Sequence, residues 1–413
     1  MFVEILIICL SIITIFFLIE KIVQKKINEI RKEFPWLITS HDELPQLSEE
    51  GLKKFISRGF DSELGWVRKP LTSNNETGKN GTTKWSISDN GARTNPSFEQ
   101  LNSKISCYGD SFTFSRQVND NQTWAHYLSK LSNTNVLNFG VGNYGLDQSL
   151  LRLKREFNNN KTQLVIIAVV PETICRIHSV WKHYYEYGNT FAFKPRFIIK
   201  NNSLIEIKNP ITNSDNLFNY EKVINEIRKN DFFYKNKFLK EKISFPYCLT
   251  IFKNFKRNYG IISWQNKINN YKKNKMDYSS IQWNSMRIIM DINMSWKIKL
   301  YKDKSACNLL KMILCEYVKI SKKMNFKPIF LFLPQKDDLS FVKNHYHFFQ
   351  NFSNELNSIE NLTVIDIVDE LLSKQNIDEL YSDDNDYGGH FSDYGNQFVS
   401  QLLFTKLKNL NLL

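Results

Sequence analysis

Two short stretches, far apart in the chain, carry residue types that together could activate a serine. Ser111 stands in the stretch Gly109-Asp-Ser-Phe-Thr-Phe114. A serine hydroxyl is a poor nucleophile unless a base takes its proton. His390 lies near the C-terminus in Tyr387-Gly-Gly-His-Phe-Ser-Asp-Tyr-Gly-Asn396, among the acidic residues Asp383, Asp384, Asp386 and Asp393. A histidine on a glycine-rich loop with a nearby carboxylate is well suited to serve as that base.

A third stretch, Asn138-Phe-Gly-Val-Gly-Asn-Tyr-Gly145, is rich in glycine. Small residues let backbone N–H groups approach a ligand closely. We expect the N–H of Ser111, with that of Gly142 or Asn143, to bind an oxyanion. Taken singly, the three stretches also fit a helix cap, a surface histidine and an ordinary strand-to-helix turn.

The elements around these stretches alternate between strands and helices. Strands are predicted at 104–108, 135–139, 163–170, 328–333 and 362–367, and helices at 122–131, 146–157, 307–324, 339–352 and 396–410. Apolar strands that alternate with helices indicate an α/β fold, with a parallel sheet covered by helices on both faces. Active sites of such sheets lie at the carboxyl ends of the strands, where Ser111 and the glycine-rich turn both fall.

The rest of the chain divides by composition. Residues 1–20 form an apolar membrane anchor, and residues 21–100 form a juxtamembrane helix, ended by Pro35, followed by a loop-rich lead-in with one or two short strands. Residues 101–180 and 305–413 form the α/β core. Residues 181–304 interrupt the core as an insertion that is dense in aromatic residues.

The N-terminal segment predicts how the chain meets a membrane. Nothing between Ile5 and Ile19 is charged, and this run is long enough to cross a bilayer if its ends adapt. A buried core helix is the alternative. Basic residues follow the run, at Lys21, Lys25, Lys26, Arg31 and Lys32. The positive-inside rule then puts the main body in the cytoplasm, although a periplasmic or other extracytoplasmic position stays open.

Charge and cysteine content restrict the partners. Residues 221–304 hold 19 Lys or Arg against 7 Asp or Glu, which is +12 of the chain's net +13. Such a segment could bind anionic lipid or acidic polysaccharide, or form solvated helix faces. No nucleic-acid module accompanies the charge, so no nucleic-acid partner is expected. The six scattered cysteines show no metal-ligand spacing, and no metal or cofactor is predicted.

The three stretches, in this order, resemble the SGNH/GDSL hydrolase family. The serine block matches at Gly109-Asp-Ser111, the glycine block at 138–145, and the histidine block at His390 with Ser392, Gly395 and Asn396. The resemblance covers about residues 101–180 and 305–413. It implies a flavodoxin-like sheet with Ser111 as nucleophile and His390 as base. Leu64-Gly-Trp66 and residues 181–189 are similar to a subgroup found in surface-polysaccharide gene clusters.

The sequence departs from the family pattern at two places. The family has an Asn after the third strand that donates to the oxyanion, whereas this chain reads Ala168-Val-Val-Pro-Glu-Thr-Ile-Cys-Arg176. We hypothesise that Asn143 supplies the missing amide or that Arg176 supplies a charge. The family also places its Asp three residues before the histidine, where Tyr387 stands. Either Asp386 orients His390, or the site is a Ser–His dyad.

The resemblance implies an ester hydrolase. The expected substrate is an O-acyl, such as O-acetyl, group on a glycan or its lipid-linked precursor. Arg176 and His183 are candidate substrate-binding residues, and aromatic residues of the insertion could stack on sugars. One alternative is an O-acyltransferase that uses the same serine. Another is a catalytically inactive, membrane-bound glycan-binding protein. The oligomeric state is not encoded in these patterns.

Overall fold

A computed structural model describes residues 2–33, 44–78, 81–274, 293–382 and 389–413. Its centre is a five-stranded sheet in the order β11-β10-β7-β5-β6, with every neighbouring pair parallel. The strands are β5 (Ser103–Gly109), β6 (Asn135–Asn138), β7 (Leu164–Val169), β10 (Lys327–Phe332) and β11 (Thr363–Asp366). Counted along the chain, this is the 2-1-3-4-5 order of flavodoxin-like sheets, as predicted.

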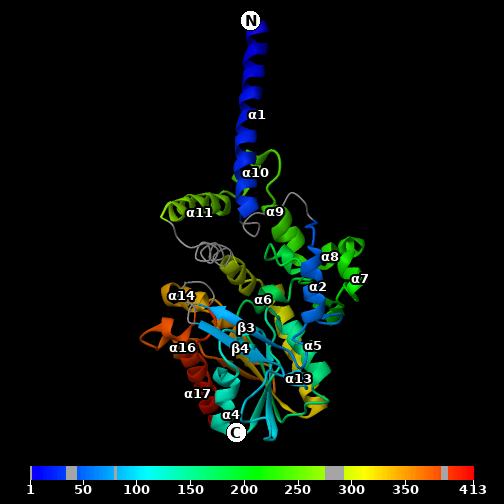
Figure 1. The fold of residues 1–413 in the computed structure, drawn as a ribbon, viewed down its shortest axis with the longest axis vertical. Coiled ribbons are helices and arrows are strands. Elements are labelled where there is room, and N and C mark those ends of the chain that lie inside the picture. The colour runs from blue at the N-terminus through cyan, green and yellow to red at the C-terminus, as the bar shows by residue number, and fades with distance from the viewer. Residues whose placement is uncertain (1, 34–43, 79–80, 275–292, 383–388) are drawn as a thin grey trace.

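Helices cover the sheet on both faces because its strands are apolar throughout. All six residues of β7 are buried. Figure 1 shows α4 (Trp124–Ser132) and α17 (Asp393–Asn409) on one side of the sheet, and α5 (Leu146–Glu156) and α13 (Lys304–Met324) on the other. The predicted α/β class and the predicted positions of these strands and helices are therefore confirmed.

Two predicted stretches differ from the structure. The single helix expected over 339–352 is two helices, α14 (Lys336–Asn344) and α15 (Gln350–Leu356), because the backbone at His345 leaves the helical region. The lead-in is more regular than its composition indicates. It contains α2 (Glu49–Arg58), begun by the Ser48 side chain that accepts the Gly51 N–H, and two antiparallel pairs, β1 (Phe60–Asp61) with β2 (Gly65–Trp66) and β3 (Ser73–Gly78) with β4 (Gly81–Ser86).

The described part of residues 181–304 adds no strand to the central sheet. It forms a separate hairpin, β8 (Arg196–Lys200) with β9 (Ser203–Ile207), and a series of helices: α7 (Ser214–Phe218), α8 (Ile224–Asn230), α9 (Leu239–Glu241), α10 (Tyr247–Lys253) and α11 (Phe255–Lys273). Trp181, Tyr184 and Tyr185 are 0% exposed. These three rings belong to the same hydrophobic core as the central sheet. They therefore cannot stack on sugars, which corrects that expectation for this part of the insertion.

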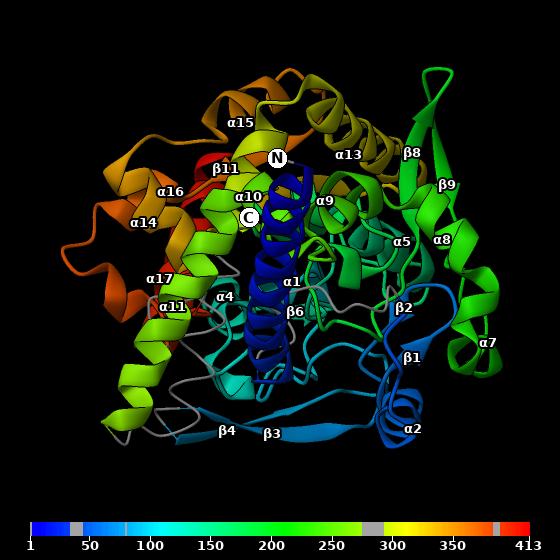
Figure 2. The same ribbon diagram turned by 90° about the horizontal axis from the view of Figure 1, so that it is seen from above.

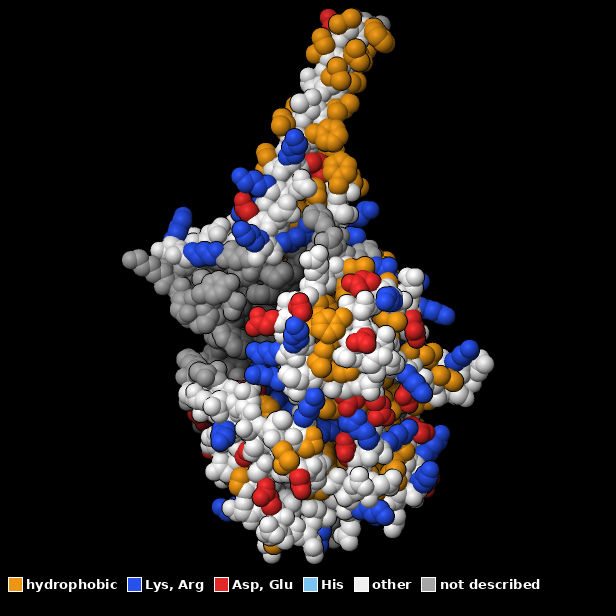
Figure 3. All heavy atoms as spheres, turned by 45° about the vertical axis from the view of Figure 1, so that its right-hand side comes forward, with side chains coloured by type: hydrophobic (Ala, Val, Ile, Leu, Met, Phe, Trp, Pro, Cys, Tyr) orange, Lys and Arg blue, Asp and Glu red, His pale blue; other side chains and the backbone are white. Residues whose placement is uncertain are grey.

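The N-terminal segment is one continuous helix, α1 (Phe2–Glu33), which joins the predicted anchor and the predicted juxtamembrane helix. An 18-residue window within Phe2–Lys32 has a mean hydropathy of 2.9 and is not buried against the rest of the molecule. It projects away from the α/β core in Figure 1, and Figure 3 shows its apolar side chains open to the surroundings. In length and composition this helix can cross a membrane.

Candidate active site

Ser111 is the first residue of a one-turn helix, α3 (Ser111–Phe114), that directly follows β5. The Asp110 carboxylate caps this turn by accepting the Phe112 N–H at 2.9 Å. The sharp bend requires glycine before it, since a Cβ on Gly109 would lie 1.8 Å from the Ala168 carbonyl oxygen. The chain therefore leaves the sheet with the Ser111 side chain at the carboxyl end of the strands.

His390 meets Ser111 across 279 residues of sequence. Its Nε2 lies 2.8 Å from Ser111 Oγ. The His390 ring packs against the ring of Phe112 at a centroid distance of 4.8 Å. Its carbonyl oxygen accepts the Ser382 N–H at 2.8 Å, which fixes the backbone beside it. The predicted pairing of these two residues is thus present as a hydrogen bond.

The residues after His390 fix the loop to α17 and α4. The Ser392 side chain caps α17 by accepting the Gly395 N–H. A Cβ on Gly395 would lie 2.0 Å from the Leu380 carbonyl oxygen, so only glycine fits this crossing. The Asn396 amide accepts the Trp124 N–H at 3.1 Å and donates to the Phe391 carbonyl at 3.0 Å. The residues that follow His390 thus fix the position of its loop.

The partner of His390 Nδ1 within the described residues is Gln117, whose Oε1 lies at 2.9 Å. The same oxygen lies 3.2 Å from the His390 backbone nitrogen. A backbone N–H can only donate, so this Gln117 atom accepts, and Nδ1 must carry a proton to hydrogen-bond to it. Nε2 is then unprotonated and faces the Ser111 hydroxyl as an acceptor. This is the tautomer that a general base needs.

Gln117 was not predicted from the sequence. It lies in the loop after α3 with φ of 70°, a left-handed backbone conformation that turns the chain back towards the histidine loop. Nothing about a lone glutamine marks it as a partner for a histidine 273 residues later. Asp386, the predicted orienting carboxylate, lies outside the described residues.

The environment keeps His390 uncharged. Burial, and then the positive charges of Arg116 and Arg176, hold the pKa of His390 well below its ordinary value of 6.5. Desolvation and nearby cations both disfavour the imidazolium form. The neutral ring is the form that can accept the serine proton.

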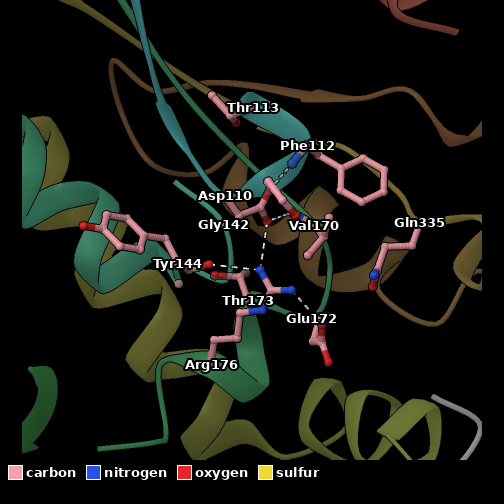
Figure 4. A network of polar contacts seen from close by, with 12 residues as sticks. Asp110, Phe112, Thr113, Gly142, Tyr144, Val170, Glu172, Thr173, Arg176 and Gln335 are labelled. Carbon is pink, nitrogen blue, oxygen red and sulfur yellow. Dashed lines mark hydrogen bonds and ion pairs between the residues drawn. The ribbon is translucent and has the colours of Figure 1, made fainter. Parts of the chain in front are cut away.

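Beneath the serine, a buried ion network centres on Arg176 of α6 (Thr173–Arg176), as Figure 4 shows. One guanidinium nitrogen lies 3.1 Å from Asp110 Oδ2 and 3.1 Å from the Tyr144 carbonyl oxygen, and the other lies 2.8 Å from Glu172 Oε2. Arg176 thereby ties together the turns that follow β5, β6 and β7. Burial opposes ionisation of Glu172, but Arg176 with Lys297 and Lys182 holds its pKa at about 2.

These contacts bear on the two candidate substrate-binding residues. Arg176 is 5% exposed, and both terminal guanidinium nitrogens are taken up by the network. His183 is also 5% exposed and packs against Trp181, Tyr187 and Phe238. Burial lowers the pKa of His183 to about 3, so it is a neutral ring in an aromatic cluster. Both side chains are therefore occupied by structural contacts inside the protein and present no surface to a substrate.

The glycine-rich turn supplies backbone N–H groups beside the serine. Asn143 has φ of 67°, and the Gly142 carbonyl oxygen accepts the indole N–H of Trp66 at 2.9 Å. In the described part of the chain, the N–H groups of Ser111, Gly142 and Asn143 meet no hydrogen-bond acceptor. Figure 4 shows Gly142 next to Asp110, the neighbour of Ser111. These donors are available to a ligand.

A pocket of about 450 Å³ adjoins this turn. Gly142 and Asn143 line one side, and lead-in residues that include Trp66, Arg68 and Trp85 line the other. The Arg68 guanidinium carbon lies 4.0 Å above the centre of the Trp85 ring and 3.9 Å above that of Phe114. Burial lowers the pKa of Arg68 to about 9, so it remains cationic at neutral pH. The lead-in is therefore part of the site's wall, a role that its composition did not reveal.

Among the described residues, no group of three or more His, Cys, Asp or Glu side chains is arranged to hold a metal ion. The six cysteines are all unpaired thiols. The groups of this site that can take part in a reaction are the serine hydroxyl, the imidazole and the backbone N–H donors.

Comparison with known proteins gives only distant likenesses. No family model matches the sequence, and no curated protein matches it. Among solved structures, the chain is similar to a candidate lipolytic protein of the G-D-S-L family from Desulfitobacterium hafniense DCB-2, with 14% identity, a TM-score of 0.32, and coverage of 74% of this chain and 99% of that one.

Two further solved structures are similar at the same level. The lipase/acylhydrolase from Enterococcus faecalis has 11% identity and a TM-score of 0.36, covering 75% of this chain and 96% of its own. An acetyl xylan esterase has 10% identity and a TM-score of 0.35, covering 73% and 98%.

Proposed function

We propose that this chain is a serine-dependent ester hydrolase of the SGNH/GDSL type. The observation that carries the proposal is the 2.8 Å contact between Ser111 Oγ and His390 Nε2, with Nδ1 bound to Gln117. This arrangement presents a neutral imidazole acceptor to a serine hydroxyl at the carboxyl ends of a parallel sheet. It is the geometry that general-base activation of a serine requires.

In the proposed mechanism, His390 takes the hydroxyl proton as Ser111 Oγ attacks the ester carbonyl. The N–H groups of Ser111 and of Gly142 or Asn143 bind the oxyanion. His390 then protonates the leaving alcohol, and an acyl-serine remains. A water molecule, deprotonated by His390, attacks this intermediate, and the carboxylic acid and free serine are released.

The orienting group for His390 is part of the proposal. We assign it to Gln117, which holds the Nδ1 proton in the required tautomer. Asp386 is the competing candidate, because the histidine block resembles one that carries a carboxylate close before the histidine. The Arg176 network has a positioning role, since it connects Asp110, adjacent to the nucleophile, to the glycine-rich turn.

The proposed substrate class is an O-acyl, such as O-acetyl, ester on a glycan or a lipid-linked glycan precursor. The pocket beside Gly142 supports this choice, because Trp66 offers a partly exposed aromatic ring and Arg68 offers a cation next to the proposed oxyanion donors. Aromatic rings bind the apolar faces of ring-shaped ligands while polar groups fix their orientation.

We further propose that α1 anchors the protein in a membrane, with the α/β core on the cytoplasmic side. The apolar, unburied helix supports the anchor, and the basic residues that follow residue 20 support the side. Protease accessibility of the C-terminus in sealed membrane vesicles tests the side. Protection in vesicles of known orientation distinguishes the cytoplasmic from the extracytoplasmic position.

The central experiment labels the full chain with a fluorophosphonate, which reacts with activated serines. We expect labelling at Ser111 that is lost in Ser111→Ala and in His390→Ala. Absence of label on the folded wild-type protein would overturn the hydrolase and leave a glycan-binding role. Product analysis with an acylated sugar and an acceptor sugar then separates hydrolysis, which releases free acid, from transfer, which makes a new ester.

A further inference from the structure

An exposed row of apolar, mostly aromatic side chains, here called the aromatic ladder, begins at Phe245, just before α10, and continues along α10 and α11 of the insertion. It consists of five side chains that are each more than half exposed: Phe245, Leu249, Phe252, Phe255 and Tyr259. Phe252 stacks on Phe255 at a centroid distance of 6.2 Å, and Phe255 stacks on Tyr259 at 5.6 Å. Large contiguous apolar surfaces of this kind mark interaction sites on otherwise polar proteins.

The ladder is continuous with α1. Phe245 stacks on Phe17 at 6.2 Å with an interplanar angle of 11°, and lies edge-on to Phe16 at 6.4 Å. Phe16 and Phe17 lie in the last turn of the uncharged run that ends at Ile19. The aromatic surface therefore passes from the end of the proposed membrane span directly onto the insertion.

Polar contacts fix α10 to α1 at this level. The Glu20 carboxylate is 3% exposed and accepts the backbone N–H groups of Tyr247 and Cys248, the latter at 2.9 Å. Two further bonds follow along the helix, from Gln24 Nε2 to the Tyr247 hydroxyl at 3.0 Å and from Arg31 to the Ile243 carbonyl at 2.8 Å. A buried glutamate that caps another helix holds that helix at one height along α1.

The position of α10 along α1 corresponds to the surface of a bilayer that α1 would span. The apolar part of α1 from Phe2 to Ile19 is about 27 Å long at about 1.5 Å per residue, close to the ~30 Å of a bilayer's hydrocarbon layer. Figures 1 and 2 show α11 lying across the direction of α1, at the base of the projecting helix. With α1 across a bilayer, α11 would lie parallel to the membrane plane.

The charge of the same segment suits an anionic surface. Residues 242–273 contain seven Lys or Arg and no Asp or Glu. Lys253 and Lys256 are exposed and alternate along the chain with the ladder residues. Figure 3 shows Lys and Arg side chains gathered around the base of α1. Aromatic rings with interspersed lysines are typical of helices that lie in the headgroup layer.

We propose that the aromatic ladder is a second membrane contact, which seats α10 and α11 in the headgroup layer of the membrane that α1 spans. The anionic lipid headgroups pair with Lys253 and Lys256, and the aromatic rings enter the boundary between headgroups and acyl chains. Two contacts fix the orientation of the α/β core relative to the bilayer, whereas a single helix would let it rotate. This proposal rests on the membrane anchor but not on the esterase activity.

Photo-cross-linking of the full chain in phospholipid vesicles tests the ladder. The photoreactive residue p-benzoylphenylalanine is placed at Phe252 or Phe255, at Ile12 within α1, or at Tyr394. Tyr394 is 44% exposed and lies on α17, a helix of the α/β core that belongs neither to α1 nor to the insertion. We expect lipid adducts at positions 12, 252 and 255, each several-fold above position 394, as read by mass spectrometry.

The four probe positions separate the ladder from the anchor. Adducts at position 12 with only the position-394 level at 252 and 255 overturn the ladder and leave the anchor. Background levels at all four positions overturn both. A dimer-sized protein adduct at 252 or 255, in place of lipid, assigns the ladder to a second copy of the chain and overturns the membrane contact.

The lysines are tested separately with the probe at position 255. Adding phosphatidylglycerol to phosphatidylcholine vesicles should raise its lipid adducts several-fold. The double variant Lys253→Gln/Lys256→Gln should lose most of this increase, while the matched exposed pair Lys322→Gln/Lys323→Gln on α13 should retain it. Equal adduct yields with and without anionic lipid would overturn the electrostatic part of the contact.

Discussion

Gln117 Oε1 lies 2.9 Å from His390 Nδ1, so an uncharged amide holds the imidazole that faces Ser111. An amide oxygen fixes the tautomer of the ring, but it adds no negative charge to stabilise the imidazolium that forms during acyl transfer. Burial and the charges of Arg116 and Arg176 already hold the pKa of His390 well below 6.5. The consequence is a base that stays neutral into the acid range.

The first prediction uses this relationship. In Gln117→Glu, a carboxylate next to Nδ1 should stabilise the imidazolium and raise the pKa of His390 by about one unit or more. Activity requires the neutral ring, so it is lost as the pH falls through this pKa. The acid limb of kcat/KM against pH, measured on p-nitrophenyl acetate, should therefore move to higher pH in the variant.

Two further variants separate Gln117 from Asp386. Gln117→Ala should lower kcat at all pH values because the ring loses its orienting acceptor, with the acid limb staying at low pH. If Asp386 orients the histidine, Asp386→Asn should produce the larger loss and Gln117→Ala little change. An unaltered pH profile in Gln117→Glu would contradict the assignment to Gln117.

The second prediction concerns the reacting pair. Ser111→Ala and His390→Ala should each lower kcat by about 10⁴-fold or more, and the double variant should be no worse than either. Residues that act as one unit lose their joint effect when either is removed. Ser373→Ala and His345→Ala, at exposed positions, are the matched controls and should leave kcat unchanged. Additive losses in the double variant would show that the two residues act independently.

Much of the core could be predicted because its signals are local. The five strands are apolar runs bounded by turn residues, and each one was found within a few residues of its observed bounds. The break between α14 and α15 and the lead-in helix α2 were missed. Both depend on short stretches around His345 and Ser48, where apolar periodicity is weak and the capping contacts decide the structure.

The same distinction separates the site residues that could be predicted from those that could not. Ser111 and His390 were predicted because each stands in a stretch whose glycines and flanking polar residues are visible in sequence. Gln117 was not, because its role depends on a left-handed turn and on a contact across 273 residues. The burial of His183 and Arg176 could not be predicted either. Composition shows that a segment is rich in aromatic and charged residues, but it does not show which of them face inwards.

The third prediction tests how the oxyanion is bound. Asn143 has φ of 67° and an exposed side chain, so Gly keeps the backbone conformation while removing the amide. If backbone N–H groups are the donors, Asn143→Gly should keep kcat within a few-fold of wild type. If the side chain is the donor, kcat should fall by about 10²- to 10³-fold. Asn143→Ala is the poorer test, because alanine lacks the short polar side chain that lets asparagine adopt the left-handed conformation, which costs other residues with a Cβ about 1–2 kcal/mol.

The fourth prediction concerns the buried network. Arg176→Met leaves Asp110 and Glu172 without their shared cation inside the protein, which should lower the free energy of unfolding by about 3–5 kcal/mol. Denaturant unfolding of the detergent-solubilised chain measures the loss. Lys53→Met, which removes an ion pair with Glu49 on the surface, is the control and should have no measurable effect.

The pH dependence of that loss identifies its cause. The pKa of Glu172 is lowered from 4.5 to about 2 in the folded protein, so its ionised form stabilises the fold. This contribution is fully present above pH about 4.5 and is lost as the pH falls through about 2. The gap between wild type and Arg176→Met should therefore be largest near neutral pH and narrow in acid. A gap that stays constant down to the acid range would indicate lost packing of the arginine side chain in place of lost charge pairing.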